Sequence, residues 1–364
     1  MEIDSSIQTE IIKILSEKLK ANYVFPEIAG EICLGLQKHL VDGDYADITE
    51  GEFFALALTV HLQEVNHDEH LWVKWHPDPL PEEDGSLRNN QAWQEERKAE
   101  AGLDNFGIHK LERLPGNIGY IDIRYFHRPA WGGDTVAAAM NFLGNANALI
   151  IDLQNCQGGY PGMMALFASY LFGDDPIHLS DIYWRDDDLT QQYWTQPYVP
   201  GKHFIDKPVY VLTSKATFSA GEGFASILQT NQRAKIIGEK TDGGSHPGAS
   251  FRLHPHFEVF IPIGRAMDPK TGAELEGVGV TPDFVLPKEH AFLAAYYMAL
   301  SEVITSCHQS SSDSIKSLTR EAQAALDELM NKYKICPACG YQNQHFFNNC
   351  KNCDEPLNKD HEQL

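Results

Sequence analysis

The sequence lacks any continuous apolar run of about 18 residues, the length that a membrane-spanning helix needs. Its first segment, Met1–Glu10, is too polar to form the apolar region of a signal peptide. These two absences predict a soluble, cytoplasmic protein with no membrane span. The alternative of a signal peptide removed ahead of this sequence stays open.

Basic residues are scarce. Lys and Arg number 29 against 51 Asp and Glu, which gives a formal net charge of −22. The field of such a chain repels phosphate, so a nucleic-acid or anionic-membrane surface is excluded. Neutral or cationic partners are expected instead.

Cysteine is also limited, and its spacing is uneven. Of seven cysteines, Cys33, Cys156 and Cys307 are scattered along the chain. An odd, unevenly spaced set argues against a disulfide framework and for a reducing compartment.

The other four cysteines form two C-x-x-C pairs near the C-terminus: Cys336 with Cys339, and Cys350 with Cys353. Four thiolates in this pattern can surround zinc tetrahedrally, which predicts a small zinc ribbon over residues 335–364. Because four protein ligands leave no open coordination position, the zinc would be structural, and catalysis would need no cofactor. The ribbon is a candidate docking site for a protein partner that the sequence does not identify.

The chain is long and apolar enough to bury a sizeable core, with 364 residues of which 43% are hydrophobic and 10% aromatic. Three N-terminal segments have apolar residues at helical spacing: Ile7–Leu19, Ile28–Leu40 and Glu52–Val65. They predict a three-helix cap over residues 1–75. Residues 76–115 form a connecting segment in which Ala92–Ala101 is expected to be a short helix.

From Gly116 the pattern changes to α/β, and residues 116–305 are expected to form the core. Short apolar runs predict buried strands, and amphipathic stretches predict helices between them. The predicted strands are Asn117–Tyr125, Ala148–Leu153 and Val259–Ile263; the predicted helices are Asp134–Leu143, Met163–Phe172 and Ala291–Thr305. Residues 306–334 are expected to hold a polar linker, Ser306–Ser314, and an amphipathic helix, Leu318–Tyr333.

The segment Val209–Glu222, VYVLTSKATFSAGE, predicts a buried strand that passes through a tight turn into a helix. Ser219 lies in this turn, and the backbone N–H groups that follow it would lie at a helix N-terminus, where they can stabilise an oxyanion. The alternative is that Ser219 only caps the helix, with Glu222 completing a capping box.

Several separated motifs occur in a familiar order: T-S-x-x-T-F-S-A-G-E, then Asn231–Thr241 and Gly277–Asp283. Over about residues 5–290 the chain resembles the C-terminal-processing, or tail-specific, serine peptidases. Within them it is most similar to the branch that includes the tricorn protease core and interphotoreceptor retinoid-binding protein. The resemblance implies an α/β, crotonase-like ββα core behind a helical cap, and hydrolysis of peptide bonds through an acyl-enzyme.

Two departures from the family pattern are informative. The roughly 35 residues between cap and core cannot hold the PDZ domain that usually lies there, which weakens the tail-specific interpretation. The family's Ser-Lys dyad is also disfavoured, because Gly244 occupies the position of the lysine. Lys240 is close in sequence but falls at a non-equivalent position.

In the tricorn-like branch a histidine serves as general base, and the resemblance assigns this role to His70. It makes Glu276 the carboxylate that assists the histidine, with Glu274 as a possible substitute. The oxyanion would be held by the N–H of Gly158 or Gly159, with Ala220 as second donor.

Alternatives for the histidine remain open. His70 could be a structural residue beside Asp68, or, on a helix, could pair with His67 around a metal that has no obvious third ligand. The other histidines that rival it as base are His246, His254 and His256. The last two would face one side of a strand.

An aromatic-rich insertion at residues 174–207 carries Tyr183, Trp184, Tyr193 and Trp194. Such residues often line a groove, so they are candidate substrate contacts, although a hairpin that packs on the surface fits equally well. The substrate would be a peptide or a protein. The competing function is a non-catalytic binding protein for an apolar ligand or a peptide on the same fold, and homo-oligomerisation stays open.

Overall fold

The computed structural model describes residues 3–82, 86–307, 312–336, 338–343 and 349–356. They belong to two compact units. Unit 1 comprises Met1–Glu100, Ser180–Gln192 and Gly244–Glu276, and unit 2 comprises Ala101–Leu179, Tyr193–Gly243 and Gly277–Leu364. The domains expected from the sequence, with a continuous core over residues 116–305, divide the chain differently from these two units. That division stays a prediction.

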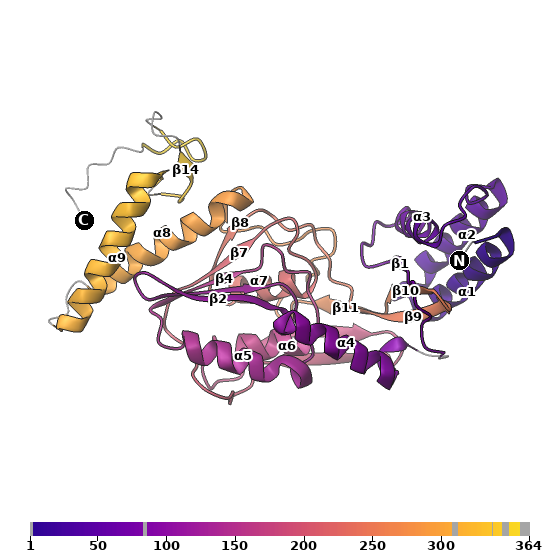
Figure 1. The fold of residues 1–364 in the computed structure, drawn as a ribbon, viewed down its shortest axis with the longest axis horizontal. Helices are drawn as coiled ribbons and strands as arrows, with labels where there is room; N and C mark the ends of the chain where they lie inside the picture. Colours follow the sequence, from indigo (N-terminus) through magenta and orange to yellow (C-terminus); the bar gives the residue numbers. More distant parts are fainter. Residues whose placement is uncertain (1–2, 83–85, 308–311, 337, 344–348, 357–364) are drawn as a thin grey trace. The chain divides into compact units, whose positions relative to one another are not determined.

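Unit 1 begins with three helices in the predicted segments: α1 (Ser5–Asn22), α2 (Pro26–Asp42) and α3 (Gly51–Gln63) (Figure 1). Asp4 caps α1 by accepting hydrogen bonds from two backbone N–H groups of the first turn. The apolar faces of the helices share one buried cluster with strands from much later in the chain. That cluster, rather than helix propensity, stabilises the cap.

Two three-stranded sheets complete unit 1. In the first, the order is β1 (Trp72–Trp75), β10 (Phe257–Pro262) and β9 (Gly248–His254), all antiparallel. In the second, the order is β11 (Gly264–Met267), β5 (His178–Trp184) and β6 (Leu189–Trp194), with the ends of β5 and β6 belonging to unit 2. The predicted short helix in the connecting segment is α4 (Gln91–Leu103), preceded by the 3-10 turn η1 (Leu87–Asn89).

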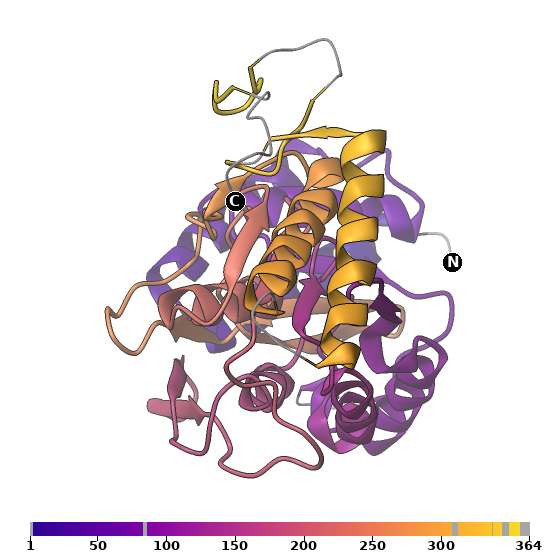
Figure 2. The same ribbon diagram turned by 90° about the vertical axis from the view of Figure 1, so that its left-hand side faces the viewer.

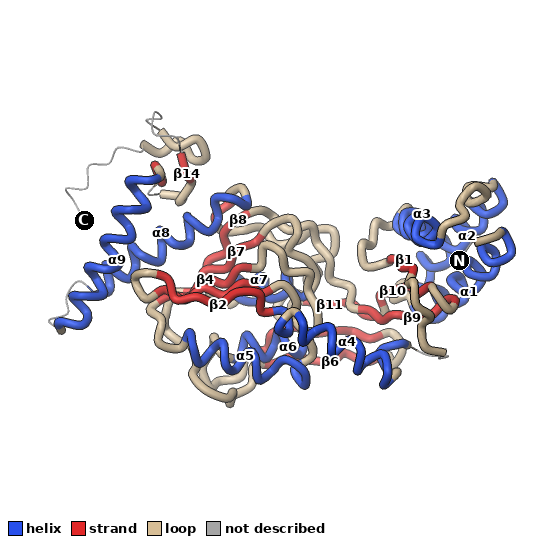
Figure 3. Tube along the Cα trace, viewed as in Figure 1, coloured by secondary structure: helices blue, strands red, loops and turns tan. Residues whose placement is uncertain are grey.

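Unit 2 is built on a six-stranded sheet, drawn in red in Figure 3. Its order is β12 (Phe284–Val285), β8 (Lys235–Gly238), β7 (Val209–Thr213), β4 (Ala148–Asp152), β3 (Ile118–Ile123) and β2 (Ile108–Leu114). All neighbours are parallel except β2, which pairs with β3 as a hairpin. The central strands are buried on both faces, which explains their continuous apolar runs.

Helices cover both faces of this sheet. Buried alanines of α8 (Lys288–Cys307) and Ala322 of α9 (Asp313–Lys332) pack on the face that carries Tyr120, Ile150 and Leu212. Figure 2 shows α8 and α9 side by side. On the other face, Leu143 of α5 (Pro129–Leu143) lies against Gly119, where a side chain would not fit. Unit 2 also contains α6 (Pro161–Ser169), α7 (Ala220–Thr230) and the short η2 (Asn105–Gly107).

The C-terminal part of unit 2 carries the short hairpin β13 (Lys334–Ile335) and β14 (Gln342–Asn343). Part of the expected linker, residues 308–311, and residues 337, 344–348 and 357–364 of the expected ribbon lie outside the described residues. In the part of the chain that is described, no helix combines the length and apolar composition that a membrane crossing requires. The mixed α/β fold class predicted from the sequence is confirmed.

Candidate active site

The turn between β7 and α7 holds Ser219 in an unusual backbone conformation. Its φ of 54° and ψ of −122° lie where residues with a side chain are rarely found, because the β-carbon crowds the backbone. Such strain costs about 1–3 kcal/mol and persists only when the surroundings enforce it. The turn places Ser219 directly before Ala220, the first residue of α7, as the sequence predicted.

Two buried hydroxyls tie this turn to the loop after β4. Thr217 Oγ1 donates to the carbonyl of Leu153 at 2.8 Å, and Ser214 Oγ donates to the carbonyl of Gln154 at 2.6 Å. Because β4 and β7 are parallel neighbours, their carboxyl ends meet at one edge of the sheet. The T-S-x-x-T motif therefore fixes the serine turn against the neighbouring loop, a structural role that the sequence analysis did not derive.

The loop after β4 brings its glycines against the serine. A β-carbon on Gly158 would lie 2.6 Å from the Cβ of Ser219 and 3.0 Å from the backbone nitrogen of Ala220. One on Gly159 would lie 2.3 Å from the carbonyl oxygen of Phe126. Both glycines also have positive φ, 93° and 128°. Gly158, Ser219 and Ala220, three of the residues singled out from the sequence, are thus brought together within unit 2.

Glu222 makes more contacts than the capping box expected from the sequence. Its carboxylate is fully buried and accepts hydrogen bonds from the backbone N–H of Ser219 at 2.9 Å, the hydroxyl of Thr241 at 2.6 Å and the N–H of Gly243 at 2.9 Å. The capping-box spacing S-x-x-E predicted only the first of these contacts. Glu222 therefore joins the serine turn to the 241–243 loop, which lies in the same unit.

Replacing Glu222 with alanine is expected to destabilise the protein by about 3 kcal/mol or more, because each buried donor left unsatisfied costs about 1–3 kcal/mol. Urea denaturation measures this change. Glu289→Ala is the matched control, because Glu289 also lies in the first turn of its helix, α8, but is exposed, whereas Glu222 in the first turn of α7 is buried. Equal stabilities for the two variants would contradict the role assigned to Glu222.

The predicted acid–base residues belong to unit 1. His70 is 6% exposed and follows a turn in which His67 has a φ of 55°, so the two histidines do not share a helix and the helical metal-pair alternative is wrong. The backbone N–H of His70 donates to Asp68 Oδ1 at 3.0 Å, and its Nδ1 lies 4.0 Å from the same oxygen. Burial lowers the pKa of His70 to about 4, although the Asp68 carboxylate opposes the shift.

Glu276 lies beside a different histidine from the one predicted. Its Oε2 accepts from the N–H of Ser245 at 2.6 Å and is 3.3 Å from Nδ1 of His246. Its neighbour Glu274 is paired with Arg265. From the sequence, His246 was expected only as one of three rivals of His70 for the role of base. No local signal in G-G-S-H-P-G shows that this imidazole reaches Asp68 and Glu276.

His254 and His256, the other two candidates for the base, do not lie together on one strand. His254 ends β9, and His256 lies in the turn before β10, so the prediction that both face one side of a strand is wrong. A two-residue turn intervenes, and Nδ1 of His256 is bonded to the carbonyl oxygen of His76 at 2.8 Å. Lys240 is exposed in the loop after β8.

The four aromatic residues of the insertion lie on β5 and β6. Tyr183 and Trp184 pack against the buried cluster of unit 1, and Trp184 Nε1 donates to Gln191 at 3.1 Å. Trp194 is 44% exposed and stacks on His178 with ring centroids 4.3 Å apart. The two strands are neighbours in their sheet, as the hairpin alternative predicted. A substrate-binding role for these side chains stays a prediction.

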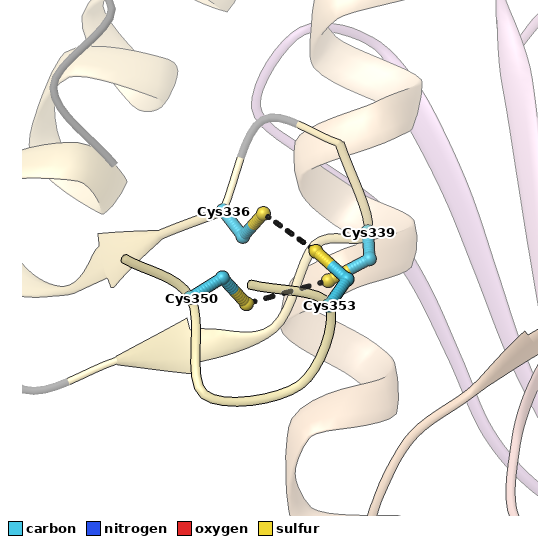
Figure 4. A group of neighbouring side chains, drawn as sticks. All are labelled: Cys336, Cys339, Cys350 and Cys353. Carbon is cyan, nitrogen blue, oxygen red and sulfur yellow. Dashed lines mark hydrogen bonds between the residues drawn. The ribbon is translucent and has the colours of Figure 1, made fainter. Parts of the chain in front are cut away.

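The four C-terminal cysteines converge, as Figure 4 shows. Cys336 and Cys353 have their sulfurs 3.6 Å apart, and those of Cys339 and Cys350 are 3.7 Å apart. Burial acts to raise the pKa of Cys350, but the backbone N–H groups of Asn352 and Cys353 and the amide of Asn343 outweigh it and lower the pKa to about 7. These neighbours therefore favour the thiolate form of Cys350.

Two family models match this chain, one in its N-terminal segment and one in the segment that follows. The model of peptidase family S41 matches residues 117–286, and the model described as the N-terminal domain of Peptidase_S41 in eukaryotic IRBP matches residues 5–101. The second match confirms the resemblance of the helical cap to the retinoid-binding-protein-like branch.

Individual relatives agree with the family models. Carboxyl-terminal-processing peptidase 2, chloroplastic, of Arabidopsis thaliana is 30% identical over 194 residues, which is 49% of this chain and 35% of the relative. The carboxyl-terminal-processing protease of Synechocystis sp. is 30% identical over 175 residues, 47% of this chain and 39% of the relative. The match thus spans less than half the length of either relative.

One solved structure shares the fold over most of the chain. A lipoprotein from Streptococcus agalactiae superimposes with a TM-score of 0.53 and 14% identity, covering 81% of this chain and 96% of that one. At this identity the likeness concerns the fold alone. Because two models of one family together account for residues 5–101 and 117–286, the chain belongs to peptidase family S41.

Proposed function

We propose that this protein is a serine peptidase that hydrolyses peptide bonds through an acyl-enzyme. Ser219 attacks the carbonyl carbon, and the N–H groups of Ala220 and of Gly158 or Gly159 hold the oxyanion that forms. The observation that carries the proposal is the strained Ser219 backbone at the start of α7, with Gly158 packed against it. A serine that merely capped a helix would have no need of a positive φ.

His70 is the proposed base, and Glu276 the carboxylate that supports it. With a lowered pKa, His70 is neutral at physiological pH and can accept the serine proton. His70 then gives this proton to the leaving amine as the acyl-enzyme forms. In the second stage His70 takes a proton from the attacking water and returns it to the Ser219 oxygen as the acyl group leaves. This mechanism requires the His70 ring and the Ser219 hydroxyl to come within about 2.6–3.2 Å of each other.

The proposed substrate is a peptide or a protein. Two relatives are named as carboxyl-terminal-processing enzymes, but each extends well beyond the matched segment, and the family's PDZ domain has no room in residues 76–115. We therefore propose peptide hydrolysis without selection of a protein C-terminus by a PDZ domain. Tyr183, Trp184, Tyr193 and Trp194 are the proposed substrate contacts, on a core of the crotonase-like class.

The C-terminal cysteines are proposed to hold a structural zinc ion in a zinc ribbon. A tetrahedron with Zn–S bonds of about 2.3 Å has S···S edges of about 3.8 Å, and the measured separations are 3.6 and 3.7 Å. Amide groups of Asn343 and Asn352 lie 3.6 and 3.7 Å from the sulfurs of Cys350 and Cys339. Donors of this kind stabilise thiolates, which are the form that binds metal.

A fluorophosphonate probe tests the peptidase proposal. The full chain is expected to react at neutral pH, and peptide mass spectrometry is expected to find the adduct on Ser219, because only an activated serine attacks the phosphorus. Failure to react would favour the competing function, a binding protein on the same scaffold. An adduct on another serine would overturn the assignment of the nucleophile.

A further inference from the structure

The buried imidazole of His246, in unit 1, lies close to three carboxylates. His246 is 3% exposed, and its Nδ1 lies 2.8 Å from Oδ2 of Asp68 and 3.3 Å from Oε2 of Glu276. On the other side of the ring, Nε2 lies 3.7 Å from Oε2 of Glu274. Asp68 and His246 are 178 positions apart in the chain, so this contact is a product of tertiary packing.

Asp68 is the link from this imidazole to the proposed base. It is 1% exposed and accepts the hydroxyl of Tyr23 at 2.8 Å in addition to the ring of His246. Its other oxygen accepts the backbone N–H of His70 at 3.0 Å. Asp68 thus fixes the turn that carries His70. The buried carboxylate of Asp68 and the half-buried carboxylate of Glu276 lie against the same imidazole, and they would repel each other without a cation between them.

We propose that His246 is a positioning residue of the peptidase: as an imidazolium it is the shared counter-ion that holds Glu276 and Asp68 together next to His70. This inference rests on the proposed function, since it concerns the same acid–base group. It explains why Glu276 contacts His246, and it gives this histidine a role other than that of a rival base.

The charge state that this role needs is the one that its surroundings favour. Burial acts to lower the pKa of His246, but the hydrogen bond and charge of Asp68 and the charges of Glu276 and Glu274 outweigh burial and raise it. Burial likewise acts to raise the pKa of Asp68, and the bond and charge of His246, the nearby His70 and the Tyr23 hydroxyl lower it instead. Arg265 is paired with Glu274, and the Phe25 ring lies T-shaped to the His246 ring with centroids 5.2 Å apart.

The charge of His246 determines how activity changes with pH. Below its raised pKa, His246 carries the charge that binds Asp68 and Glu276; above it, that charge is lost and the two carboxylates repel each other. Activity should therefore fall on the alkaline side through the pKa of His246. On the acid side it should fall near pH 4, where His70 becomes protonated.

The experiment is the rate of fluorophosphonate labelling of the full chain between pH 4 and 10. His246→Gln is expected to label roughly 100-fold more slowly at neutral pH, the effect of misplacing a catalytic group by about an ångström, and to lose the alkaline fall. His109→Gln, which changes an exposed histidine of β2, is the control and should match the native profile. An unchanged profile in His246→Gln would overturn the inference while leaving the peptidase intact.

A second variant guards against a simple folding defect. Glu274→Gln removes one carboxylate that raises the pKa of His246, so the alkaline fall should move to lower pH. An alkaline limb that stays in place would contradict the role of His246.

Native protein that never labels would remove the proposed function and this inference together. NMR titration of the histidine rings in Ser219→Ala protein, with His246 assigned by its variant, should give a pKa above 6.5 whether or not the enzyme is active.

Discussion

Replacing Ser219 with alanine is expected to lower peptidase activity by roughly 10⁶-fold, the loss seen when the nucleophile of a serine peptidase is removed. The reason is that no other group can form the acyl-enzyme, so the remaining rate comes from binding and oxyanion stabilisation alone. Hydrolysis of a fluorogenic peptide and labelling by the fluorophosphonate probe measure the loss.

The matched control is Ser226→Ala. Ser226 lies on the same helix, α7, and its carbonyl accepts the hydroxyl of Thr230 at 2.8 Å, an interaction that its own side chain does not make. This variant should retain full activity. Equal activity in Ser219→Ala and Ser226→Ala would remove Ser219 from the mechanism.

The strained backbone at Ser219 also predicts a difference in thermal stability between two variants of this residue. Glycine adopts positive φ without crowding, so Ser219→Gly should unfold at a higher temperature than Ser219→Ala, by the equivalent of about 1 kcal/mol. Both variants should be inactive. Such a result would show that stability is lost at this turn to position the hydroxyl.

Substituting Cys350 with serine is expected to release the proposed zinc ion and to unfold the proposed ribbon. Structural zinc supplies about 10–16 kcal/mol of apparent binding free energy in small zinc domains, which is more than so short a segment can gain from its own core. Zinc per chain should fall from one to nearly zero by atomic emission. Hydrogen exchange should show loss of amide protection in β13 and β14, while β4 and β7 keep theirs.

Cys307→Ser is the control, because Cys307 at the end of α8 is not among the four converging cysteines. It should keep its zinc. Labelling of Ser219 should survive the loss of zinc in Cys350→Ser, since four thiolates leave no position for substrate. Protein purified without metal and with paired disulfides would contradict the ribbon.

Local patterns predicted the elements that depend on local physics. The apolar run Val209–Thr213 followed by small residues predicted a strand, a turn and a helix, and the structure has β7, the Ser219 turn and α7 there. The spacing of Cys336, Cys339, Cys350 and Cys353 predicted their convergence. In each case the residues that interact are close in sequence, or their spacing directly limits the geometry.

Other features needed the three-dimensional structure. The two hairpin histidines, His254 and His256, were expected on one strand because alternation alone does not show where a strand ends. Glu222 was interpreted as a capping residue because its second and third partners, Thr241 and Gly243, come from a distant loop. The spacing S-x-x-E is the same whether the glutamate only caps a helix or also joins the helix to a distant loop.

By itself the sequence determined the α/β class, the serine at a strand-to-helix turn, the cysteine cluster and the family. These follow from periodicity, turn chemistry and motif order, which are properties of neighbouring residues. Only the tertiary structure decided that His246 lies between Asp68 and Glu276, and that segments 180–192 and 244–276 belong with the first hundred residues. The physical reason is that buried charges select partners by proximity in the folded core, and no local pattern encodes which distant side chains packing brings together.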